Sequence, residues 1–310
     1  MYRVGYIISY MFSGSTVLSL MLAAHPEIAT VGELIGVNPK ILGNKQAALN
    51  YLCSCGKKVI ECSFWNELSN RLKKRGINFC HPYLGTRFSF SNVSIINSLF
   101  TRSMPNNAIQ TLRERFVKTI PPFKNQFYKI ASVNASSVEE ILKMTGKKVL
   151  IDESKDHIHF MRLASIQGLD VRPIFLTRDG RGVALSVRNH GIIKDFRHAV
   201  KSWIRVNKSA LRTITATKRF YLHVRYEDLC AMPSETLQKI HRFLDLDPKP
   251  WPPQNLKYEH HVLGNDMRVM FDGVINLDTK WKYEITTQEL NYFPKIAGKM
   301  IAALGYDKYV

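Results

Sequence analysis

A short apolar run near the N-terminus leads directly into a turn of small polar residues and then into a helical pattern. Residues 4–8 have the length and composition of a buried strand, and residues 9–16 hold three serines, a glycine and a threonine. Residues 17–22 then place apolar side chains at helical spacing. A strand, a tight turn and a helix in this order begin a βαβ unit, so the opening predicts an α/β fold built on a parallel sheet.

The same N-terminal stretch has a second interpretation, as a signal peptide or a membrane anchor. Only Arg3 is basic before the apolar run, and serines and a glycine interrupt it, which disfavours that interpretation. No other stretch is long and apolar enough to span a bilayer. The odd total of five cysteines fits a reducing compartment. We therefore expect a cytoplasmic protein without stable membrane insertion, with N-terminal targeting as the alternative.

Strand and helix patterns alternate again in the second half of the chain. Strands are predicted at residues 148–151, 171–177 and 220–224. The expected helices cover residues 158–166, 182–188, 196–215, 234–244 (with Ser234 as N-cap) and 287–304. Residues 39–129 lack this alternation and are rich in aromatic and basic side chains. We expect them to be a helical or irregular insertion in a single domain, residues 1–310, that shapes the site for a second substrate.

The excess of basic over acidic residues indicates that the protein binds a negatively charged partner. Forty-four Lys and Arg against 25 Asp and Glu give a net charge of +19. Such a surplus favours nucleic acid, an acidic membrane or a small ligand that carries phosphate or sulfate. The sequence has no helix-turn-helix, zinc-finger or aromatic ribonucleoprotein signature, so nucleic-acid binding is kept only as an alternative.

The first candidate site is the turn Ser13-Gly14-Ser15-Thr16, between the first strand and the first helix. Backbone N–H groups and hydroxyls at a helix N-terminus favour an anion. The turn lacks the lysine of a Walker A loop, which disfavours ATP chemistry. The alternative is a tight turn with a capping serine.

Two further candidate sites come after later strands. Arg178 and Arg181 stand at the end of the strand at 171–177, and Ser186 comes eight residues after Arg178. Guanidinium groups and a hydroxyl suit a terminal phosphate, whereas the alternative is a surface Arg–Asp pair. Tyr226 comes directly after the next strand and is a third candidate for ligand binding. The alternative is that its side chain is part of the hydrophobic core.

Taken in this order, the three segments resemble the sulfotransferase family, whose members use 3′-phosphoadenosine-5′-phosphosulfate (PAPS) on a P-loop-like, three-layer α/β fold. The resemblance covers most of the chain. The segments Cys53-Ser54-Cys55-Gly56, Asp152-Glu153-Ser154-Lys155 and 261–268 resemble a bacterial-type branch of the family, with similarity to carbohydrate and tyrosylprotein sulfotransferases. It implies that Ser13, Gly14, Ser15 and Thr16 hold the 5′-phosphosulfate and that Arg178 and Ser186 hold the 3′-phosphate, with Arg181 nearby. It further implies that Tyr226 meets the adenine and that Gly264, Asn265 and Arg268 form a late loop over the cofactor.

The resemblance also suggests the catalytic groups. Glu33 stands where tyrosylprotein-type members have a catalytic glutamate, and Lys155 resembles a lysine that stabilises the transferring group. His157 is the alternative base. The expected reaction moves a sulfonate to an acceptor hydroxyl, of a saccharide or anionic glycan in preference to a phenol, lipid or peptide tyrosine. Each residue also has a structural alternative without a catalytic role. Glu33 would form a salt bridge at a strand end, Lys155 would be solvated, and His157 would be a polar residue in the first turn of a helix.

Two features need separate consideration. The position before Ser13 is usually basic in the family, and here it is Phe12, which makes a weak or inactive PAPS-binding relative the second hypothesis. Cysteines gather in one stretch, but their spacing fits no standard zinc pattern. Free thiols or one local disulfide are therefore favoured over a metal, and no metal is expected. The cysteines concerned are Cys53, Cys55, Cys62 and Cys80, the last next to His81.

Overall fold

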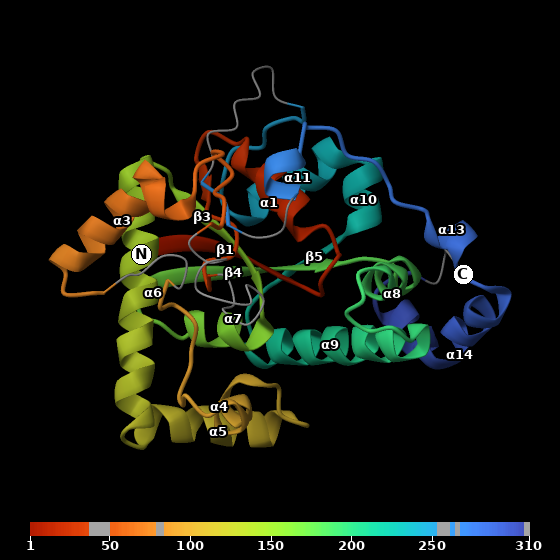
Figure 1. The fold of residues 1–310 in the computed structure, drawn as a ribbon, viewed down its shortest axis with the longest axis horizontal. Helices are drawn as coiled ribbons and strands as arrows, with labels where there is room; N and C mark the ends of the chain where they lie inside the picture. The colour runs from red at the N-terminus through yellow and green to blue at the C-terminus, as the bar shows by residue number, and fades with distance from the viewer. Residues whose placement is uncertain (37–49, 79–83, 253–260, 264–266, 307–310) are drawn as a thin grey trace.

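The computed structural model describes residues 1–36, 50–78, 84–252, 261–263 and 267–306. Five parallel strands form one sheet in the order β2-β3-β1-β4-β5 (Figure 1). The strands are β1 (Tyr2–Ser9), β2 (Ile28–Thr30), β3 (Val149–Lys155), β4 (Leu169–Thr177) and β5 (Leu222–Arg225). All five therefore end at the same edge of the sheet, where ligands of open α/β folds bind.

Each face of the sheet buries its own apolar cluster. Along β1, Val4, Tyr6 and Ile8 face one cluster and Ile7 faces the other, as the two-residue period of a strand requires. One face is covered by α1 (Ser15–Ala23), α10 (Tyr226–Ala231) and α11 (Pro233–Phe243). The other is covered by α6 (Phe123–Thr145), α7 (His157–Leu163), α8 (Gly180–Asn189), α9 (Phe196–Ala216) and α14 (Thr287–Ala303). The predicted three-layer α/β fold with a central parallel sheet is confirmed.

The predicted strands and helices of the second half are all present, with shifted ends. One detail is wrong: Ser234 does not cap its helix, because α11 begins one residue earlier at Pro233, with Met232 as N-cap. The Ser234 hydroxyl instead accepts a hydrogen bond from the backbone N–H of Trp251. Proline suits the first helical position because its missing N–H would have no helical partner there.

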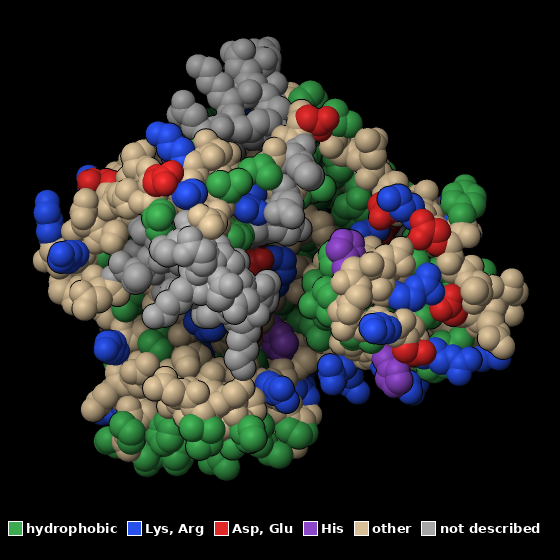
Figure 2. Space-filling model, viewed as in Figure 1, with side chains coloured by type: hydrophobic (Ala, Val, Ile, Leu, Met, Phe, Trp, Pro, Cys, Tyr) green, Lys and Arg blue, Asp and Glu red, His purple; other side chains and the backbone are tan. Residues whose placement is uncertain are grey.

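The region predicted as an insertion contributes helices, and its described residues form none of the five sheet strands. These helices are α3 (Ser63–Lys74), α4 (Ser94–Thr101), α5 (Asn107–Thr119) and the start of α6. Exposed apolar side chains gather over α4 and α5, at the foot of the view in Figure 2. Among the described residues, no helix combines the length and the apolar character needed to cross a membrane.

Candidate active site

An ion pair stands at the carboxyl edge of the sheet, where β3 ends. The Lys155 ammonium lies 2.5 Å from a Glu33 carboxylate oxygen, and both side chains keep a quarter or so of their surface exposed (21% and 28%). Lys155 has a φ of +68°, so the chain turns sharply as it leaves the strand and directs this side chain toward Glu33. The structure thus brings two of the three predicted catalytic residues into contact.

Two buried acids precede Lys155 in β3, Asp152 and Glu153, and neither was among the predicted site residues. Burial raises the pKa of Glu153 to about 8 and the pKa of Asp152 to about 6. Burial opposes the charge of Lys155, but the Glu153 and Glu33 carboxylates outweigh it and raise the Lys155 pKa. The signal that could have pointed to these acids was present: two carboxylates in succession follow the apolar start of this strand, residues 149–151.

The turn after β1 leads into α1 without a side-chain cap. Gly14 is the N-cap, with a φ of +88°, and the helix has no side-chain cap among the described residues. The capping-serine alternative is therefore not what the structure shows. Ser13, Ser15 and Thr16 are buried, and the Thr16 hydroxyl lies 3.2 Å from a Glu153 oxygen. The turn and the end of β3 are thus neighbours at the sheet edge.

Arg178 and Tyr226, from the second and third candidate sites, both contact this turn or each other. Arg178 donates a hydrogen bond of 2.8 Å to the carbonyl oxygen of Phe12, and its guanidinium lies 4.8 Å from the centre of the Tyr226 ring. The Tyr226 ring also packs against Gly14 so closely that a Cβ there would lie 2.6 Å from it. Three segments far apart in the sequence therefore meet around one turn, and only glycine fits at its centre.

The Arg178 guanidinium also forms an ion pair with the carboxylate of Asp278, a residue that the sequence analysis did not single out. Asp278 Oδ2 accepts a hydrogen bond of 2.9 Å from Arg178, and the Asp278 pKa is lowered although burial acts to raise it, because Lys280 and Arg178 hold the charged form. Arg178 is nearly buried, and this carboxylate is one of the groups that its guanidinium contacts.

Two other predicted phosphate ligands have local partners. Arg181 forms a two-pronged ion pair with Asp179, and its guanidinium lies 4.0 Å from the centre of the Trp281 ring. The Ser186 hydroxyl donates to the carbonyl oxygen of Gly182, one turn earlier in α8. The structure therefore brings Arg178 to the turn after β1 and holds Arg181 and Ser186 in contacts close to their own helix.

The remaining predicted residues lie elsewhere. The His157 ring contacts the hydroxyl of Ser103, and burial lowers the His157 pKa. Arg268 donates two hydrogen bonds, of 3.2 and 3.0 Å, to the carbonyl oxygen of Leu52. Gly264 and Asn265 lie outside the described residues. His157 and Arg268 thus contact groups other than the ion pair at the end of β3.

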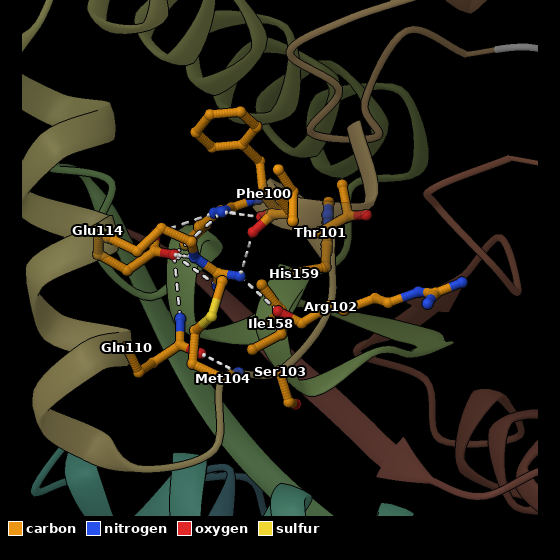
Figure 3. Close-up of polar contacts among 12 residues, drawn as sticks. Phe100, Thr101, Arg102, Ser103, Met104, Gln110, Glu114, Ile158 and His159 are labelled. Carbon is orange, nitrogen blue, oxygen red and sulfur yellow. Dashed lines mark hydrogen bonds and ion pairs between the residues drawn. The ribbon is translucent and has the colours of Figure 1, made fainter. Parts of the chain in front are cut away.

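A cavity of about 290 Å³ opens beside the end of β3. Its wall includes Asp156, directly after Lys155, and combines apolar with polar side chains: Ile35, Phe88, Ile158, Arg87, Asn97 and Thr101. Figure 3 shows how the outer wall is held, with Gln110 and Glu114 of α5 facing the segment from Phe100 to Met104.

The polar core of this wall is an arginine pair around one carboxylate. Arg162 of α7 binds both oxygens of Glu114, at 2.9 and 3.0 Å, and Arg113 binds the same carboxylate at 2.8 Å. All three side chains are nearly buried, at 1%, 12% and 6% exposure for Arg162, Glu114 and Arg113. The network fixes α5 against α7 and thereby fixes the shape of the cavity.

Solved structures resemble this chain, although no family model and no curated protein matches it. The sulfotransferase domain from the curacin biosynthetic pathway superimposes with a TM-score of 0.50 at 16% identity, covering 97% of this chain and 98% of that one. The chain has the fold of a sulfotransferase domain. The sulfotransferase domain of the Synechococcus PCC 7002 olefin synthase has a TM-score of 0.48 at 19% identity, over 95% of this chain and 94% of that one.

Proposed function

We propose that this protein is a PAPS-dependent sulfotransferase that moves a sulfonate to an acceptor hydroxyl. The observation that carries the proposal is the meeting of Arg178 and Tyr226 with the turn around Gly14. A helix N-terminus whose N-cap is a glycine and a nearly buried guanidinium lie together at the carboxyl edge of a parallel sheet. This combination suits a ligand with two separate anionic groups, as the 5′-phosphosulfate and 3′-phosphate of PAPS are.

The binding roles come from the elements that carry these residues. The N–H groups of Ser13 to Thr16 at the start of α1 receive the 5′-phosphosulfate, and Arg178 receives the 3′-phosphate once Asp278 gives way. The Tyr226 ring borders the turn and offers a surface for the adenosine.

The chemistry belongs to Glu33 and Lys155. The acceptor oxygen attacks sulfur, the bond from sulfur to the phosphate oxygen breaks, and adenosine 3′,5′-bisphosphate (PAP) leaves. Glu33 takes the hydroxyl proton, and Lys155 stabilises the negative charge on the transferring group. The ion pair places the Glu33 carboxylate beside the Lys155 ammonium before the acceptor arrives.

The cavity beside β3 is the proposed acceptor site. Its lining includes Asp156, the residue after Lys155, the aromatic side chain of Phe88 and the exposed residue Arg87. An aromatic surface and a cation suit a saccharide that carries an acidic group, which remains our preferred acceptor class.

One observation favours a second candidate function, a PAPS-binding protein with little or no turnover. Phe12 stands where a basic residue is usual, and its ring stacks on His190 at 4.5 Å between centres. A missing charge at the transferring group costs about 3 kcal/mol, or about a hundredfold in rate.

The test measures PAPS turnover with a panel of hydroxyl acceptors, in parallel with PAP affinity. Glu33→Gln should lower turnover by about 10²-fold or more and leave PAP affinity near that of wild type, because Glu33 acts only as base. Glu235→Gln on α11 is the matched control and should change neither. PAP binding without turnover on any acceptor would favour the second candidate, and absence of PAP binding would reject both.

A further inference from the structure

Three cysteines and a histidine bring their ligand atoms together near the segment that follows β2. Sγ of Cys53, Sγ of Cys55, Sγ of Cys62 and Nδ1 of His261 all lie within 4.8 Å of one another. Cys62 Sγ is 3.7 Å from Cys55 Sγ and 3.9 Å from Cys53 Sγ. His261 Nδ1 is 3.1 Å from Cys62 Sγ and 3.7 Å from Cys53 Sγ.

These separations are those of ligands around a metal. A disulfide needs sulfurs about 2.05 Å apart, and none of the four described cysteines is in a disulfide. Zn–S bonds of about 2.3 Å in a tetrahedron place neighbouring sulfurs about 3.8 Å apart. The two measured sulfur–sulfur distances lie on either side of that value.

Local backbone geometry holds the cysteines in place. Cys53 and Cys55 flank the start of a tight turn in which the Gly56 N–H donates to the Cys53 carbonyl at 3.0 Å and Gly56 adopts a φ of +83°. The Cys53 N–H donates to the Lys57 carbonyl at 2.9 Å, which closes the turn. Cys62 is the N-cap of α3, so its sulfur lies at the positive end of a helix.

Long-range pairing brings the histidine to the cysteines. The Leu263 N–H donates to the Val31 carbonyl at 2.9 Å, and the Val262 N–H donates to the Ser54 hydroxyl at 2.8 Å. The Phe64 ring of α3 stacks on the His261 ring at 4.7 Å and 4°, which fixes the plane of the imidazole. Contacts of this kind orient a metal ligand before the metal binds.

We propose that Cys53, Cys55, Cys62 and His261 bind one Zn²⁺ in a structural site. Three thiolates and one imidazole are a ligand set that zinc prefers, and four protein ligands leave no open position for catalysis. The proposal departs from the expectation of free thiols or a local disulfide. That expectation considered Cys80 and His81, which lie outside the described residues, and did not consider His261, 199 positions after Cys62.

The site would join three segments beside Glu33. The Glu33 N–H donates to the Leu263 carbonyl at 3.2 Å, and a Cβ on Gly32 would lie 1.9 Å from that same carbonyl oxygen. Zinc therefore fixes the segment that supports the proposed base, a consequence that rests on the proposed function, whereas the metal site itself does not.

The test is the metal content of the full chain, purified without chelator and without a metal-affinity step. Elemental analysis should find about one zinc per chain. Replacing zinc with Co²⁺ should give thiolate-to-cobalt charge-transfer bands and the visible bands of a tetrahedral ion. A wild-type protein that holds no zinc, binds no Co²⁺ with that spectrum, or contains a disulfide within the cluster would overturn the proposal.

Variants separate the ligands from structural neighbours. Cys62→Ser and His261→Ala should each weaken zinc affinity by at least about 100-fold in competition with a chromophoric chelator. His261→Cys should retain the metal, because it supplies a fourth thiolate, and Cys230→Ser on α10 is the matched control that should bind zinc as wild type does. If His261→Ala binds zinc as tightly as the control, His261 is not a ligand and the proposed site is wrong. The wild-type cobalt spectrum decides the question even if a variant fails to fold.

Discussion

The contact between Arg178 and Asp278 predicts opposite effects for two single substitutions. Arg178 lies in the proposed 3′-phosphate site, and the Asp278 carboxylate lies 2.9 Å from its guanidinium. Arg178→Ala removes the cation that would bind the phosphate, so PAP affinity should fall. Asp278→Asn removes the anion that competes with the phosphate, so PAP affinity should rise.

The magnitudes are set by burial and distance. Arg178 is nearly buried, and a hydrogen bond to a charged group contributes about 1.5–3 kcal/mol, so Arg178→Ala should weaken PAP binding about 10- to 150-fold. Two like charges about 4 Å apart repel by up to about 4 kcal/mol near a protein surface. The Asp278 side chain is 36% exposed, and screening by water reduces that repulsion to about 1–2 kcal/mol, or roughly tenfold in affinity.

Isothermal titration with PAP at two salt concentrations measures both effects. Asp272→Asn is the control and should bind PAP as wild type does, because the Asp272 carboxylate accepts a hydrogen bond from the Val274 N–H within its own loop. If Arg178→Ala binds PAP normally, or if Asp278→Asn weakens PAP binding as much as Arg178→Ala does, the phosphate does not occupy this face of the guanidinium and the reasoning fails.

Three further predictions concern stability. The pKa of Glu153 is raised to about 8, so the folded state holds a proton that the unfolded state releases near pH 4.5. The free energy of unfolding of the wild type should therefore fall as the pH rises from 4.5 to 8, by about 1.4 kcal/mol per pH unit at the steepest. Urea titrations at about pH 6 and about pH 9 should show a smaller fall for Glu153→Gln than for wild type. A profile as steep as that of wild type would assign the slope to another group. Glu114→Gln leaves two buried arginines without their carboxylate and should lower the free energy of unfolding by about 3–5 kcal/mol in chemical denaturation, and a loss under about 1 kcal/mol would contradict a buried network. Gly32→Ala places a Cβ against the Leu263 carbonyl at a φ of +75° and should lower the melting temperature more than Gly76→Ala, whose added Cβ meets nothing within 4 Å at a similar φ of +74°. Equal losses in these two variants would contradict the close approach at Gly32.

The sequence was sufficient for the architecture because the signals are local. Apolar runs of strand length alternate with helical patterns after residue 148, and each was found close to its predicted place. The three-residue strand β2 and the long helix α6 were not predicted. A strand of three residues is too short for a periodic signal, and it exists because all three residues, Ile28–Thr30, pair with β3.

The candidate site was predictable in part for the same reason. Ser13 to Thr16, Arg178 and Tyr226 each come after a strand, and parallel strands bring the residues at their carboxyl ends to one edge of the sheet. Asp278 and His261 do not lie directly at the end of a strand. Asp278 reaches Arg178, and His261 reaches Cys62, through contacts between distant segments that one sequence does not reveal. Ser186 has the right spacing, but its hydroxyl bonds within its own helix.

The measurement that tests the central claim most directly is a calorimetric titration of the wild-type protein with PAP, with ATP and adenosine 5′-phosphosulfate as controls. Our account predicts that PAP binds at least about tenfold more tightly than either control, because only PAP offers a 3′-phosphate to Arg178 together with a 5′-anion to the start of α1. Equal affinity for all three nucleotides, or no binding of PAP at low and moderate salt, would contradict the account and leave the chain with the fold of a sulfotransferase and another function.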